Sequence, residues 1–109
     1  MAESEGIDII RESDTSILVA AYLADSLGAK ITSGTTTYRL WHVVPTSGAL
    51  ETYDFSDNTF KTGAVTTATA ALTHRTAENG TRNTGVWTAR LATLTGFTVG
   101  DKYYVEVSH

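Results

Sequence analysis

The chain has 109 residues, enough to bury one hydrophobic core and too few for two. It contains no cysteine, which excludes disulfide bonds and thiolate metal sites. Its formal net charge is −4 and its eight Lys and Arg residues are scattered along the chain, which argues against nucleic acid as a partner.

The composition favours β structure. The sequence holds 20 threonines and one proline, and β-branched residues lose rotamer freedom in helices but pack well on a sheet. With 41% hydrophobic residues, and with two Trp, five Tyr and three Phe, the chain is too apolar for disorder. We therefore expect an ordered, strand-rich domain.

The first twelve residues differ from the rest of the chain. They open with MAESEGID, which is acidic and polar, unlike the basic start of a signal peptide. No apolar run in the sequence has the length of a membrane span, so we expect synthesis in the cytoplasm and no membrane insertion. We expect residues 1–12 to form an extended N-terminal arm and residues 13–109 to form a single domain.

The segment TSILVAAYLAD allows two interpretations. As a strand, it places Ile17, Val19 and Leu23 on one face and Leu18 and Tyr22 on the other. As a helix, ILVAAYLADSL is apolar on every side. The β-branched start and the LGAK turn favour the strand.

The next alternating segment, TTTYRLWHVV, places Tyr38 and Leu40 on one face and Trp41 and Val43 on the other. If this strand neighbours the strand at 17–25, the outward residues of both form an apolar patch, and such patches mark contact sites. Two alternatives stay open, namely cover by the chain's own N-terminal segment and a register shifted by one residue. The residues that we expect in protein contacts are Ile7, Ile9, Ile10, Leu18, Tyr22, Trp41 and Val43.

Polar clusters in the middle of the chain have structural and functional interpretations. Asp54, Asp57 and Asn58 in YDFSDN could supply oxygen ligands to calcium, but the distal glutamate of a calcium loop is missing, so we expect a turn. The NGT at 79–81 matches a glycosylation acceptor, and a turn is again the better account. Between these clusters we expect a strand at Ala70 to His74.

Two more alternating segments, GVWTARL and DKYYVEVS, close the chain. They direct Trp87 and Tyr103 inward. Short turns rich in Gly, Asn and Asp separate the strands, a spacing typical of a sandwich or a small barrel.

The order of these signatures resembles that of small immunoglobulin-like β-sandwich modules of tailed-bacteriophage virion proteins. The resemblance rests on the opening strand with its Asp25 to Gly28 turn, TTYRLWHV, LETYDFSDNTFKTG, NTGVWTARL and GDKYYVEV. It implies an all-β fold, an antiparallel immunoglobulin-like β-sandwich of about seven strands. It also implies a virion protein whose partners are other capsid or tail proteins, or further copies of the same chain.

No catalytic motif is recognisable. His42, His74 and His109 lie outside any nucleophile motif, and the glycines lack a phosphate-cradling spacing. We expect no enzymatic activity, no cofactor and no metal.

Two functions fit this description. The first is a structural or accessory virion protein, for capsid decoration or in the tail, that acts through protein–protein contacts. The second is a carbohydrate-binding module that stacks exposed aromatic residues on a host-surface glycan, with Trp41, Tyr22 and Tyr104 as candidates. A sugar site needs polar groups such as Asp, Asn or Arg around its aromatic platform, and from the sequence Trp41 has mainly apolar neighbours.

Overall fold

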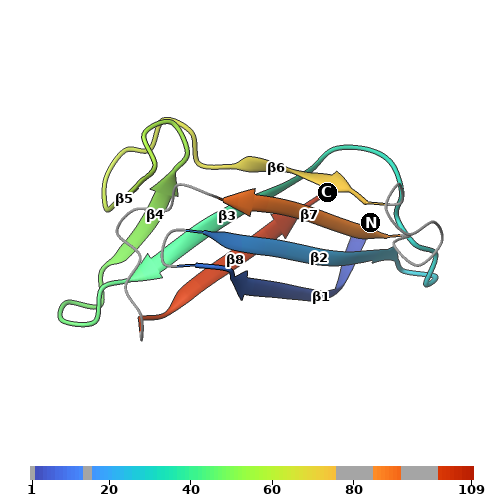
Figure 1. The fold of residues 1–109 in the computed structure, drawn as a ribbon, viewed down its shortest axis with the longest axis horizontal. Helices are drawn as coiled ribbons and strands as arrows, with labels where there is room; N and C mark the ends of the chain where they lie inside the picture. The colour runs from blue at the N-terminus through green and yellow to red at the C-terminus, as the bar shows by residue number, and fades with distance from the viewer. Residues whose placement is uncertain (1, 14–15, 76–84, 92–100) are drawn as a thin grey trace.

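The computed structural model describes residues 2–13, 16–75, 85–91 and 101–109. In these ranges the protein consists of strands and turns, without a helix, and every strand pairing is antiparallel. The strands are β1 (Ala2–Arg11), β2 (Ile17–Asp25), β3 (Thr36–Val43), β4 (Leu50–Asp54), β5 (Thr59–Lys61), β6 (Ala70–His74), β7 (Val86–Leu91) and β8 (Tyr103–Ser108) (Figure 1).

The predicted all-β, antiparallel character is thus confirmed. The helix interpretation of ILVAAYLADSL is wrong, because Ile17–Asp25 forms β2. The strand expected at 70–74 is β6. No helix in the described part of the chain is long and apolar enough to span a membrane.

One hydrogen-bonded sheet contains all eight described strands, in the order β1-β2-β7-β6-β3-β4-β5, with β8 on the other edge of β3. The sheet folds over on itself. Figure 1 shows β1, β2 and β7 in front, with β3 and β8 crossing behind them at an angle. The link is β6, whose residues 70–72 pair with β3 and whose residues 73–74 pair with β7.

The hydrophobic core lies between the two layers. Alternation decides which residues enter it: β2 contributes Ile17, Val19, Ala21 and Leu23, all almost fully buried. Side chains of β3 meet them from the other layer. The buried hydrophobic cluster contains Ile17, Val19, Ala21, Leu23, Tyr38, Leu40, Tyr53, Leu72, Trp87 and Leu91.

Both aromatic residues predicted to point inward do so. Trp87 is 4% exposed and its indole Nε1 donates a hydrogen bond of 2.9 Å to the carbonyl of Ile31. Tyr103 is half-buried against the core. Gly85, just before β7, has a φ of 81°, and a Cβ there would lie 2.8 Å from the carbonyl oxygen of Leu23, so the position requires glycine.

Residues 2–11, expected in an extended arm, form β1. This strand pairs with nearly the whole of β2, from Ala2 opposite Asp25 to Arg11 opposite Ile17, with a bulge between Ser4 and Gly6. In the described part of the chain β1 pairs with β2 alone and forms an edge of the sheet. The other edge of β1 is therefore open as far as the described strands are concerned.

Candidate functional site

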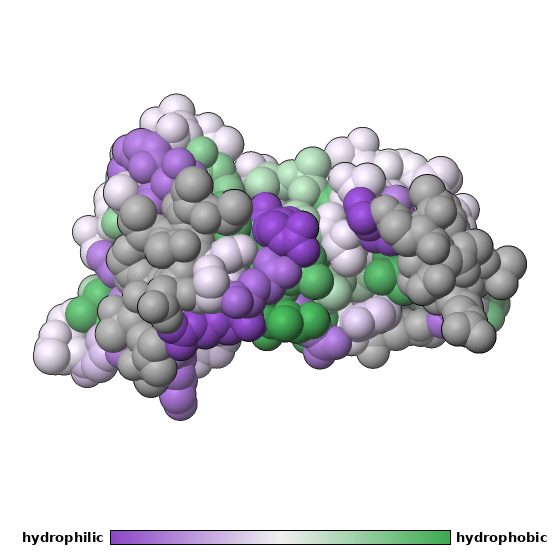
Figure 2. Space-filling view, in the orientation of Figure 1, coloured by the Kyte–Doolittle hydropathy of each residue, from purple (hydrophilic) through white to green (hydrophobic). Residues whose placement is uncertain are grey.

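The open edge of β1 gathers three exposed isoleucines. Ile7, Ile9 and Ile10 are 36%, 39% and 48% exposed. Ile7 and Ile9 lie opposite Ala21 and Val19 and so face the core side at the rim of the layer, whereas Ile10 lies beside Leu18 on the outer side. Figure 2 shows hydrophobic residues over β1 at the lower centre, flanked by hydrophilic ones. We call the open strand with these three residues the β1 edge.

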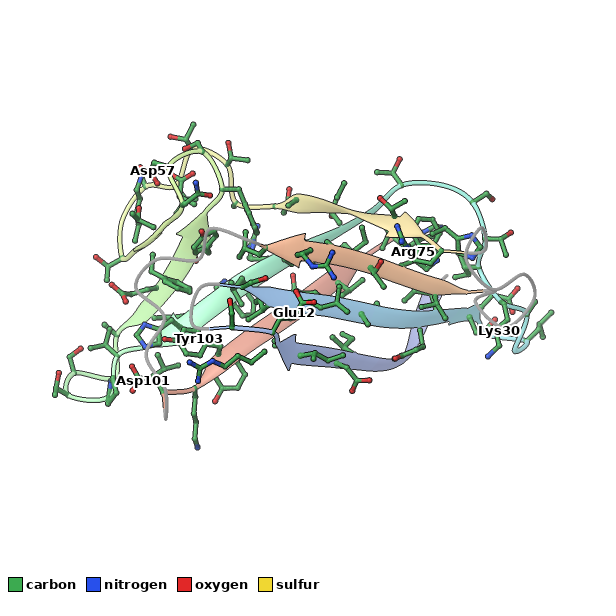
Figure 3. All side chains as sticks on the ribbon, in the orientation of Figure 1. Glu12, Lys30, Asp57, Arg75, Asp101 and Tyr103 are labelled. Carbon is green, nitrogen blue, oxygen red and sulfur yellow. The ribbon has the colours of Figure 1, made fainter. Side chains whose placement is uncertain are left out.

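Two polar contacts hold β1 in place. The Tyr22 hydroxyl donates to Oδ2 of Asp8 at 3.2 Å, and burial, followed by the neighbouring Asp8, raises the pKa of Tyr22. Just beyond β1, the Glu12 carboxylate accepts two hydrogen bonds from Arg90 of β7, at 2.8 and 2.9 Å. The Arg90 contact lowers the pKa of Glu12. Figure 3 shows Glu12 lying over the front layer.

A second candidate surface is the outer side of β3 and its two neighbours. Trp41 lies in its middle, opposite Tyr104 of β8 on one side and Thr52 of β4 on the other. Two residues before Trp41 in β3, Arg39 lies opposite Glu106 of β8. Two residues after Trp41, Val43 lies opposite Leu50 of β4. We call this surface the Trp41 face, made of Arg39, Trp41, Val43, Leu50, Thr52, Tyr104 and Glu106.

The Arg39 guanidinium stacks over Trp41, with Cζ 5.9 Å from the ring centroid. Its Nε is buried and, within the described chain, has no hydrogen-bond partner. Trp41 is half-buried, and Tyr104 is 47% exposed. The Trp41 face therefore combines aromatic rings with charged and hydroxyl groups.

The patch expected from Leu18, Tyr22, Trp41 and Val43 required β2 and β3 to be neighbours, which is wrong. In the described sheet β2 pairs with β1 and β7, and β3 pairs with β4, β6 and β8. Leu18 and Tyr22, both half-buried, lie on the outer side of one layer, and Trp41 and Val43 on that of the other. The structure instead brings Leu18 next to Ile10 and Trp41 next to Tyr104.

His42 contacts two acidic side chains, a structural role that the sequence analysis did not predict. His42 is 7% exposed, with Nδ1 3.0 Å from Glu51 Oε1 and Nε2 3.0 Å from Asp101 Oδ2. It also stacks on Tyr103, with centroids 4.8 Å apart. Figure 3 shows Asp101 and Tyr103 close together where β8 begins.

The two other histidines also make structural contacts. His74 Nε2 accepts a hydrogen bond of 2.9 Å from the backbone N–H of Gly85. His109 Nδ1 lies 2.8 Å from the Thr36 hydroxyl. Within the described residues, no three His, Asp or Glu side chains converge on a position where they could hold a metal ion.

The YDFSDN cluster forms a bonded turn. Asp54 is fully buried and accepts hydrogen bonds from Lys61 (2.8 Å) and from Ser56 (2.6 Å from the hydroxyl, 3.0 Å from the backbone N–H). The backbone N–H groups of Thr66 and Thr67 also donate to it, at 3.0 and 3.1 Å. Lys61 lies 2.7 Å from Asp57 as well, so an ammonium group occupies the place between the carboxylates where calcium would bind.

No protein-family model, no curated protein and no solved structure matches the chain. The resemblance to phage virion modules thus rests on the sequence motifs alone. The NGT at 79–81 lies outside the described residues. Function has to be argued from the β1 edge and the Trp41 face.

Proposed function

We propose that this protein is a non-enzymatic module that acts through protein–protein contacts made by the β1 edge. The observation that carries the proposal is a ten-residue outermost strand with an open edge and three exposed isoleucines. An open edge presents a row of N–H and C=O groups that pair readily with another chain. Exposed isoleucines beside this row add apolar area that a partner would remove from water.

We propose further that the fold is an immunoglobulin-like β-sandwich and that the protein is a structural or accessory component of a tailed-phage virion, bound to capsid or tail proteins. The sandwich is supported by two layers that cross at an angle around one core and by a strand, β6, that pairs in both. The virion setting is supported by the sequence resemblance. Since fold does not determine function, the setting needs its own test.

The test is incorporation into phage particles. Ile9→Lys places a charge on the β1 edge without removing a strand, whereas deletion of residues 1–12 would strip β2 of its partner. The matched control is Leu27→Lys, at a position that is 93% exposed in the turn after β2. We expect Ile9→Lys to be lost from purified particles and Leu27→Lys to be retained, with both proteins folded by circular dichroism.

Normal occupancy of Ile9→Lys in particles would overturn the contact role of the β1 edge. Absence of the wild-type protein from particles would overturn the virion setting. The contact role would then have to be sought in another assembly.

The Trp41 face favours a second candidate function, binding of a carbohydrate. Aromatic rings stack on the apolar faces of sugars, and hydroxyl or charged groups beside them bond sugar hydroxyls. From the sequence Trp41 has mainly apolar neighbours on its own face, but the fold surrounds it with Tyr104, Thr52 and Arg39. These are the polar companions that a sugar site needs.

A glycan array separates the two candidates. If the second holds, the wild type binds a defined set of glycans, and both Trp41→Ala and Tyr104→Ala abolish binding while Ile9→Lys does not. If the wild type binds no glycan, or if Trp41→Ala binds like the wild type, the carbohydrate function is contradicted.

A further inference from the structure

We infer that the Trp41 face binds an acidic oligosaccharide and that the Arg39 guanidinium holds a carboxylate of the sugar. The inference lies outside the contact role of the β1 edge. It rests on the carbohydrate function given above as the second candidate, and it adds the class of sugar and the residue that selects it. The Trp41 face belongs to the back layer and the β1 edge to the front layer, so each can be altered without the other.

The rings of Trp41 and Tyr104 form the centre of the site. They occupy directly opposite positions of β3 and β8, where side chains on one face of a sheet are about 5 Å apart. Trp41 is half-buried and Tyr104 is 47% exposed, so solvent reaches both residues. On the other side of Trp41, Thr52 adds a hydroxyl group. We call the two rings the aromatic platform.

Arg39 lies beside this platform as a cation without a counterion in the described part of the chain. Its guanidinium stacks on Trp41, and its Nε is buried without a hydrogen-bond partner. Glu106 lies opposite Arg39 on β8, yet no ion pair joins the two side chains. A guanidinium presents a planar fork of N–H donors that matches a carboxylate, so Arg39 is available to a carboxylate of a ligand.

A second cation lies at the other end of the face. Lys102, Tyr104 and Glu106 are exposed and the residues between them are half-buried, so Lys102 shares the outer side with Tyr104. The carbonyl of Lys102 accepts a hydrogen bond of 3.4 Å from the N–H of Val43, which sets Lys102 beside the end of β3. From residue 39 to residue 43 a strand spans about 13 Å. Positive groups therefore flank the aromatic platform at both ends.

A sugar fits this face better than a peptide does. The backbone of β3 around Trp41 pairs with β4 on one side and with β8 on the other. A peptide laid across it would find no open strand edge, which is what sheets use to bind extended peptides. A sugar needs only ring faces and polar side chains, and the two cations favour a sugar that carries carboxylates.

Two negative features of the protein weaken the attraction without removing it. The net charge of −4 acts over distances at which physiological salt screens the interaction. The exposed Glu106 would repel a carboxylate bound to Arg39, but water weakens interactions between exposed charges. Removal of the Glu106 charge should therefore strengthen binding of an acidic sugar.

The first experiment is isothermal titration calorimetry of the full chain with three acidic probes: tetragalacturonate, sialyllactose and a hyaluronan tetrasaccharide. Each is compared with a neutral form of itself, in which the carboxylates are reduced to alcohols. We expect at least one acidic probe to bind about tenfold or more tightly than its neutral form, and we expect the difference to shrink between about 0.05 M and about 0.5 M salt. Equal binding of each acidic probe and its neutral form overturns the inference.

The second experiment repeats the titration with variants. Arg39→Gln should weaken binding of the acidic probe about threefold to tenfold, and Lys102→Gln about twofold, with no change for the neutral form. Glu106→Gln should strengthen binding of the acidic probe about twofold. The control is Arg11→Gln, which removes the same charge from an exposed position of β1 and should change nothing.

Circular dichroism checks that each variant is folded, and the exposed Lys102 and Glu106 test the charge preference even if Arg39→Gln does not fold. Acidic binding that none of these three variants changes, or that Arg11→Gln weakens as much as they do, overturns the inference. Hexaglutamate that binds through Trp41 while the acidic sugars do not bind overturns the sugar as the ligand.

The inference and the carbohydrate function fail separately. Glycans that bind through Trp41 but show no preference for carboxylates overturn the acidic class and leave the carbohydrate function in place. A wild type that binds no glycan and no acidic probe overturns both, and leaves the contact role of the β1 edge untouched.

Discussion

At the scale of single residues, Asp54 accepts hydrogen bonds from three separate segments of the chain. It lies at the end of β4, and its two carboxylate oxygens bond to Lys61 of β5, to the turn at Ser56, and to the loop that leads to β6. The hydrogen bond from Lys61 is the largest cause that holds the pKa of Asp54 far below its usual value, followed by the Ser56 hydroxyl. Only the ionised carboxylate satisfies all these donors.

Because the pKa of Asp54 is lowered, we predict that the free energy of unfolding decreases in acid. Because its pKa is lower in the folded than in the unfolded protein, the stabilisation is fully present above about pH 5 and is lost progressively as the pH falls below the unfolded pKa of about 4 toward the folded pKa. Urea unfolding of the wild type and of Asp54→Asn tests this. The difference between their free energies of unfolding should be constant from about pH 5 to 8 and should shrink below about pH 4. A difference that stays constant into acid would contradict the role of the charge.

The raised pKa values of two buried tyrosines predict how stability changes at alkaline pH. Burial, with Tyr53 nearby, raises the pKa of Tyr38 to about 12, and burial, with Asp57 nearby, raises that of Tyr53 to about 12. A raised phenol pKa means that folding is favoured while the phenol is neutral, and that this contribution is lost as the pH rises from the unfolded value near 10 through about 12. Absorbance at about 295 nm should show late ionisation that Tyr38→Phe and Tyr53→Phe each reduce. Ionisation of Tyr38 and Tyr53 with an ordinary midpoint near pH 10 in the folded protein would be the opposite result.

At the scale of elements, β3 carries the plainest alternation in the protein. Thr36, Tyr38, Leu40 and His42 are buried, and the residues between them are half-buried on the outer side. The strand pairs with β4, β6 and β8, so its inner face is the centre of the back layer. A change on that face should cost far more than one on the outer face.

Leu40 and Leu50 give a matched comparison. Leu40 is fully buried and Leu50, opposite Val43 on the Trp41 face, is 55% exposed. Leu40→Ala should lower the free energy of unfolding by about 3 kcal/mol, and Leu50→Ala by less than about 1 kcal/mol. Chemical denaturation measures both, and equal losses would show that the alternation of β3 does not define the core.

The faces of β2, β3, β7 and β8 were predictable because a period of two is a local signal. Which strands lie side by side was not, because pairing depends on contacts between residues far apart in the sequence. The alternation within its own segment predicted that Trp41 points outward. Its neighbour Tyr104, however, comes from a strand 63 residues later. The contact between His42 and Asp101 was missed for the same reason, since the two residues are 59 positions apart in the sequence.

At the scale of the whole molecule, two layers share one core and β6 joins them. The front layer ends at β1, which also approaches β8 of the other layer. Among the described strands, none pairs with the outer side of β1, and an unpaired strand edge is the part of a sheet to which another chain can add. The segment expected to be an extended arm is thus a strand that pairs with β2 along one side.

Hydrogen exchange of the β1 amides tests this account most directly. In a single molecule only alternate N–H groups of Gly6 to Arg11 bond to β2, so every second amide is open to water. When a partner chain occupies the β1 edge, we predict slow exchange at all six of these amides, and the alternating fast and slow pattern in Ile9→Lys. The same alternating pattern in both proteins would contradict pairing through the β1 edge, and fast exchange at all six amides in both would contradict the pairing of β1 with β2.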